Sequence, residues 1–133
     1  MRPLLVLVCL AAAGTAAAGL RIDDRVPVAV PAGKPVSCIP LSSIRETRVR
    51  DDRTIDFVMR GRSPEAYRVT LPQGCPELGF EQRFGYATSL SQLCDTDIIT
   101  VLRQAPLMQG ASCGLAPFQP VTLPSHRLVG ARR

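Results

Sequence analysis

Histidine is almost absent from the 133-residue chain, which holds His126 alone. A cysteine–histidine nucleophile would therefore need the C-terminal tail to fold back beside a thiol. The chain also lacks any C-x-x-C pair, so it has no closely spaced pair of cysteine ligands of the kind that structural zinc sites use. No segment has the strand–turn–helix context of a glycine-rich phosphate loop. We therefore predict no metal ion, no cofactor and no assigned catalytic residue.

Long hydrophobic runs are absent too, since a membrane-spanning helix needs about 20 apolar residues in succession. The apolar run at residues 4–13 follows Arg2 and precedes the small residues Ala16-Ala17-Ala18. This order is typical of a cleavable secretory signal. We predict a signal peptide at residues 1–18, cleaved after Ala18, a periplasmic or secreted protein, and no membrane span.

Lysine is represented by Lys34 alone among 16 basic residues, and the formal net charge is +5. The arginines between residues 45 and 62 alternate with Glu46 and three aspartates, so no stripe of one sign forms in the sequence. A mixed, solvated surface is favoured, and we predict no nucleic-acid partner.

Four cysteines remain beyond the predicted signal: Cys38, Cys75, Cys94 and Cys113. An even number in an oxidising compartment indicates two disulfides, for which three connectivities are possible. Our hypothesis is a nested pairing, with Cys75–Cys94 inside Cys38–Cys113. The segment between Cys75 and Cys94 would leave the sheet and return, and the outer pair would meet if the first and last strands approach each other.

The periodicity of the chain predicts short strands more often than helices. Alternating apolar and polar residues predict strands at 47–50, 55–60, 67–71 and 84–88, and the apolar, β-branched stretch 97–103 predicts a central strand. Residues 89–94 match a capping box and predict one helical turn, with Ser89 and Ser91 as caps. Residues 104–114 indicate a loop. Pro117 and Pro120 make 115–123 a candidate edge strand.

These elements predict a mainly β fold: a small antiparallel meander curled into a partly open barrel, with one or two short helical turns. A flat sheet with a helix packed on one face is the alternative. We divide the chain into the signal peptide, an extended N-terminal arm at 19–37, a disulfide-stabilised β domain at 38–123 and a C-terminal tail at 124–133.

Three aspartates in RVRDDRTIDFVMR (48–60) raise the question of acid–base or metal chemistry. Asp51 and Asp52 fall between two predicted strands, where aspartate favours turns through side-chain bonds to nearby backbone N–H groups. Asp56 lies on the strand face opposite Phe57, and we expect it to point to solvent or to a neighbouring arginine. The pattern therefore indicates the tip of a β-hairpin.

Five phrases occur in an order that resembles an uncharacterised family of small exported four-cysteine proteins from Gram-negative bacteria, known as a domain of unknown function. They are CIPLSSIR (38–45), DDRTIDFVMRG (51–61), YRVTLPQGCPELGF (67–80), SLSQLCDTDIITV (89–101) and ASCGLAPF (111–118). The resemblance implies a signal peptide and a four-cysteine periplasmic domain. It implies no activity and transfers no catalytic residue.

Two classes of function are compatible with these observations. The first is a non-enzymatic domain that binds an envelope protein or ligand through an exposed face or edge. The second is a small carboxylate-dependent envelope hydrolase using Asp51, Asp95 or Asp97. Asp95 more often ends a helical turn, and a catalytic pair of acids requires a shared cleft. The sequence favours the binding domain.

Overall fold

The computed structural model describes residues 26–88, 90–104 and 106–124. The predicted signal peptide, Ser89 and His126 lie outside the described residues, as does nearly all of the predicted C-terminal tail.

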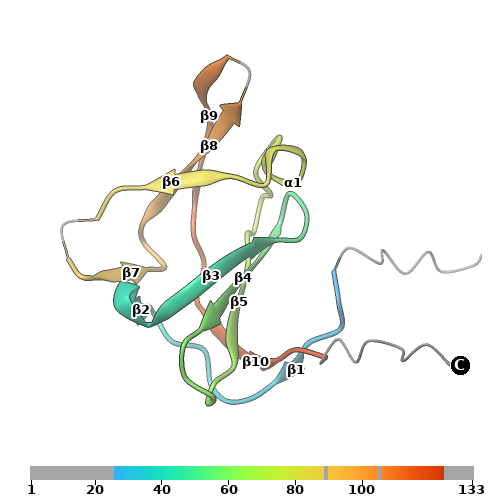
Figure 1. Ribbon diagram of the computed structural model, residues 1–133, viewed down its shortest axis with the longest axis vertical. Helices are drawn as coiled ribbons and strands as arrows, with labels where there is room; N and C mark the ends of the chain where they lie inside the picture. Colours follow the sequence, from blue (N-terminus) through green and yellow to red (C-terminus); the bar gives the residue numbers. More distant parts are fainter. Residues whose placement is uncertain (1–25, 89, 105, 125–133) are drawn as a thin grey trace, which may run out of the picture.

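The described residues form an antiparallel, mainly β fold with two short helical turns, as predicted (Figure 1). The elements in chain order are β1 (Val30–Pro31), β2 (Cys38–Pro40), η1 (Leu41–Ser43), β3 (Ile44–Val49), β4 (Thr54–Met59), β5 (Ala66–Thr70), α1 (Leu78–Glu81), β6 (Phe84–Tyr86), β7 (Gln92–Cys94), β8 (Ile98–Gln104), β9 (Leu107–Gly114) and β10 (Gln119–Thr122).

The largest sheet has the strand order β1-β10-β5-β4-β3. Its β3-β4-β5 part is the predicted meander, and β4 and β5 pair in one continuous register from Thr54↔Thr70 to Val58↔Ala66. A second sheet has the order β6-β8-β9, and β2 pairs with β7 in a third. The three sheets surround a common core without closing into a barrel.

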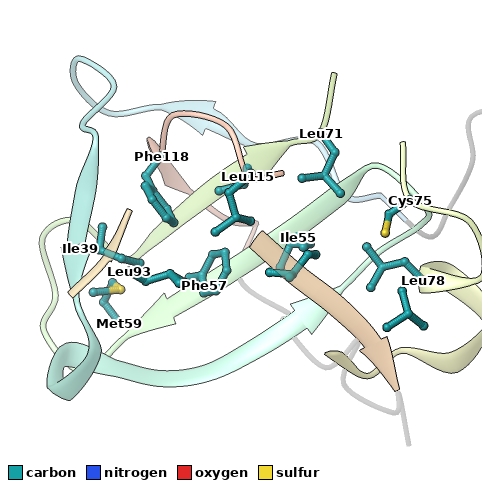
Figure 2. Close-up of a cluster of buried hydrophobic side chains, with 13 residues drawn as sticks. Ile39, Ile55, Phe57, Met59, Leu71, Cys75, Leu78, Leu93, Leu115 and Phe118 are labelled. Carbon is teal, nitrogen blue, oxygen red and sulfur yellow. The ribbon is translucent and has the colours of Figure 1, made fainter. Parts of the chain in front are cut away.

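The core lies on the face of β4 that carries Ile55, Phe57 and Met59 (Figure 2). Phe57 meets Phe118 edge to face, with ring centroids 5.6 Å apart. Ile99 and Val101 on β8 are fully buried in the same cluster, and β8 lies between β6 and β9. The prediction of a central strand at 97–103 is therefore confirmed.

Three local predictions are wrong. Residues 92–94 form strand β7 instead of a helical turn, because pairing with β2 buries Leu93. Residues 107–114 form strand β9 instead of a loop, because the chain turns back along β8. Strand β10 is not at the sheet edge, since β1 pairs with it on the side away from β5. The Pro120 carbonyl oxygen accepts a 2.8 Å hydrogen bond from the Ala32 N–H, just beyond the end of β1.

The prediction of two disulfides is confirmed, but the nested pairing is wrong. Cys38 bonds to Cys94, and Cys75 bonds to Cys113. Cys38 and Cys94 are opposite each other in the β2–β7 register, so formation of β7 determines the first bond. The second bond attaches the loop before α1 to β9. The nested pairing was predicted from a loop at 104–114 and a helical turn at 89–94. Because both segments contain strands, the cysteines on them meet other partners than predicted.

The N-terminal arm is extended where it is described, and β1 makes it part of the largest sheet. Ala29 packs on a small cluster formed by Val58, Ala66, Val121 and Leu123, on the sheet face away from the main core. The sheet therefore starts before Cys38.

Candidate functional site

The predicted turn between β3 and β4 is confirmed. Asp51 Oδ1 accepts hydrogen bonds from the backbone N–H groups of Arg53, at 2.8 Å, and of Thr54, at 2.6 Å. This is the local side-chain-to-backbone bonding for which aspartate is favoured in turns. Asp51 therefore has a structural role.

Asp52 connects the same turn to α1. Its Oδ1 accepts a hydrogen bond of 2.7 Å from the Gly79 N–H, and its carbonyl oxygen accepts one of 2.6 Å from the Cys75 N–H. A Cβ atom at position 79 would lie 3.0 Å from the backbone of Asp51 and Asp52, which is closer than most side chains pack, so glycine favours this close approach. The turn and the 75–79 segment are thus held together.

A cleft of about 930 Å³ lies between β3, the β3–β4 turn and α1. We call it the hairpin–helix cleft; its lining includes Arg48, Arg50, Asp51, Asp52, Glu77 and Phe80. The Phe80 side chain is 87% exposed, whereas an aromatic side chain that packs in a core is largely buried. Arg48 is half-exposed and forms an ion pair with Glu46, which is equally exposed.

Asp56 is the one fully buried carboxylate among the described residues. Arg50 Nε donates to its Oδ2 at 2.8 Å, and Arg68 donates through Nε to Oδ1 at 2.7 Å and through Nη2 to Oδ2 at 2.9 Å. The expectation of a neighbouring arginine is confirmed, whereas the alternative of a solvent-facing side chain is wrong. Both oxygens are occupied, and the network positions Arg50 at the cleft.

Two of the acids that a hydrolase would use, Asp51 and Asp97, lie in different parts of the fold. Asp97 Oδ2 accepts a 2.7 Å hydrogen bond from the Cys94 N–H, and Asp97 lines a separate, shallow cleft beside β6 and β8. Asp95 lies in the turn between β7 and β8, where its own N–H donates to Ser37. Asp51 and Asp97 thus line different clefts, and the carboxylate of each accepts at least one backbone N–H, which is a structural use of an acid.

Phe80 is the exposed aromatic residue of this cleft, and the sequence analysis did not single it out. It follows the loop that carries Cys75, and a lone phenylalanine gives no sign of whether it will be buried or exposed. The neighbouring residue Gly79 is the one sequence feature that could have indicated this arrangement, because a glycine can mark a place where two backbone segments approach closely. That contact turns the first residues of α1 toward the turn and leaves Phe80 outside the core.

Within the described ranges, no group of three or more His, Cys, Asp or Glu residues is arranged to hold a metal ion. No helix in the same part of the chain is both long and apolar enough to cross a membrane. The two disulfides are compatible with an oxidising compartment. Comparison with models of protein families, with curated proteins and with solved structures found no match.

Proposed function

We propose that the chain is an exported domain that binds an envelope protein or ligand without catalysis, and that the hairpin–helix cleft is its binding site. The observation that carries the proposal is Phe80, 87% exposed at a cleft of about 930 Å³ that also contains arginine side chains.

Aromatic and arginine side chains contribute a disproportionate part of the energy in protein interfaces. Covering the Phe80 ring would contribute about 1.5–3 kcal/mol from burial of apolar surface. Arg48 can exchange Glu46 for an acidic group of a partner, because an exposed ion pair contributes only about 0–1 kcal/mol.

Two carboxylates of the cleft are already in use, because Asp51 and Asp52 accept backbone N–H groups. Glu77 accepts two hydrogen bonds from Arg103 at 2.7 and 2.9 Å, and this pair is as exposed as the pair between Arg48 and Glu46. The Arg48 guanidinium is the donor of the cleft that a ligand can reach most readily. We infer a ligand that presents an apolar group beside a carboxylate or another anion.

Export forms part of the same proposal. It is supported by the signal-like residues 1–18 and by two disulfides that join distant parts of the fold. Membership of the uncharacterised family of exported four-cysteine proteins that residues 38–118 resemble is proposed with it.

A photo-cross-linking amino acid in place of Phe80, introduced in the exporting cell, tests the site. We expect a discrete adduct that is absent when the same group replaces Leu90, which is exposed but outside the cleft. Addition of Arg48→Ala should weaken the adduct. Identical adduct patterns at both positions, or none at position 80, would contradict the proposal.

A further inference from the structure

Strand β3 presents its outer edge to the hairpin–helix cleft. The lining of the cleft includes Thr47, Arg48, Val49 and Arg50 in succession. Successive side chains of a strand point to opposite faces, so a surface lined by four consecutive residues follows the edge of the strand rather than one face. β3 is the outer strand of the five-stranded sheet, and no strand in the described part of the chain covers this edge.

The hydrogen bonds between β3 and β4 determine which backbone groups point into the cleft. The Arg50 N–H donates to the Thr54 carbonyl oxygen at 2.8 Å, so these two residues form a hydrogen-bonded pair. In an antiparallel ladder such pairs alternate with pairs whose N–H and C=O groups point away from the partner strand. The pairs that β4 forms with Thr47 and Val49 are of the second kind. Two donors and two acceptors are therefore left at the outer edge of β3.

The other side of β4 agrees with this alternation. The Met59 N–H donates to the Glu65 carbonyl oxygen at 3.0 Å, so odd-numbered residues of β4 bond to β5 and even-numbered ones bond to β3. No other described residue forms a hydrogen bond with the four outward groups of β3. The irregularity in the β3–β4 register lies between Ile44 and Glu46, outside the lining of the cleft. The edge is regular where it borders the cleft.

We propose that an extended segment of a partner protein adds to β3 as an antiparallel strand within this cleft. The inference rests on the proposed function and narrows its ligand to a peptide. Backbone hydrogen bonds to Thr47 and Val49 would supply affinity, and alternate side chains would supply specificity. α1 lies across the cleft, beside the turn that ends β3 (Figure 1). A second folded sheet would bring its next strand a further ~4.8 Å toward α1, whereas a single segment ends within the cleft.

The two faces of β3 determine which side chains the segment would carry. Val49 packs against the core cluster that also contains Leu78 of α1, so Thr47 and Val49 are on the face toward α1. Arg48 is on the opposite face. The residue opposite Arg48 would therefore be acidic. The residues on either side of it would be apolar, because their side chains point to the α1 side of the cleft, where Phe80 is exposed.

A fluorescent pentapeptide, with a central glutamate between two valines and a threonine at each end, tests strand addition by fluorescence anisotropy. The valines would lie opposite Thr47 and Val49 and point their N–H groups to β3, whereas the glutamate N–H would point to solvent. Methylation of either valine nitrogen should raise the Kd at least ~10-fold, because it removes a hydrogen bond and puts a methyl group in its place. Methylation of the glutamate nitrogen is the matched control and should change the Kd by less than about 2-fold.

A variant of the protein tests the same bonds from the other side. Thr47→Pro removes an outward N–H at an edge position, where strands tolerate proline. It should raise the Kd for the unmethylated peptide at least ~10-fold, whereas Thr47→Val keeps the N–H and should bind like the parent protein. The melting temperature of Thr47→Pro shows whether it folds, and the methylated peptides test the bonds on the parent protein if it does not.

The outcomes separate strand addition from the proposed function. No binding up to roughly 1 mM peptide, equal losses from methylation at all three nitrogens, or a loss confined to the glutamate nitrogen would overturn strand addition. The cross-link at position 80 does not depend on backbone hydrogen bonds. An adduct that Thr47→Pro leaves unchanged would keep the cleft as a binding site and overturn strand addition alone. Absence of any adduct at position 80 would contradict the proposed function and strand addition with it.

Discussion

Replacing Asp56 by alanine would remove the shared partner of two arginines. Asp56 is 0% exposed, while the side chains of Arg50 and Arg68 are 16% and 14% exposed. Three charge-assisted hydrogen bonds of 2.7–2.9 Å would be lost. Breaking a buried ion pair by removing one partner costs about 3–5 kcal/mol, because an uncompensated charge is left behind. The arginines retain some access to water, so we expect about 3 kcal/mol, the lower end of that range.

The free energy of unfolding from urea titration, with both disulfides intact, measures this effect. Glu46→Ala is the matched control. It removes the acid from the exposed ion pair between Glu46 and Arg48, and should lower the free energy of unfolding by at most about 1 kcal/mol. Replacing Asp56 and Arg68 together by apolar residues should recover part of the loss, as it does for other buried pairs. A cost below about 1 kcal/mol for Asp56→Ala would refute the buried network as a source of stability.

Further predictions concern the disulfides, the turn and the N-terminus. Non-reducing peptide mapping should join Cys38 to Cys94 and Cys75 to Cys113, and a peptide joining Cys75 to Cys94 would contradict the structure. Asp51→Asn should lower the free energy of unfolding by well under about 1 kcal/mol, because asparagine supports the same turn; a loss near 3 kcal/mol in a denaturant titration would show that the charge itself is required. Gly79→Ala should cost about 1–3 kcal/mol, since its Cβ would press on backbone atoms that cannot move aside freely; an unchanged urea midpoint would exclude the close contact. N-terminal sequencing of exported protein should begin near Gly19, and an intact Met1 would exclude cleavage.

The strands that could be predicted are those whose side chains alternate strongly and, in β8, the one that forms a continuous apolar, β-branched run. In β4, Ile55, Phe57 and Met59 share one face, and local periodicity alone identifies such a strand. Strands β7 and β9 have no such signal. β7 is only three residues long, and β9 contains two glycines and small polar residues, so long-range pairing with β2 and β8 determines their structure. The disulfide pairing could not be deduced because it depends on these two strands.

Part of the candidate site could also be anticipated. The turn at Asp51 uses bonds between residues two and three positions apart, and local chemistry was enough to predict it. Asp56 was limited to two environments by alternation, but its burial depends on Arg68, which is twelve residues away on the neighbouring strand. The hairpin–helix cleft requires the bond between Asp52 and Gly79, which are 27 residues apart. A contact between residues so far apart in the sequence cannot be predicted from the local pattern of residues. The position of Phe80 at the cleft follows from this contact. The sequence thus indicated which acids shape the fold, whereas the surface available for binding followed only from the assembled structure.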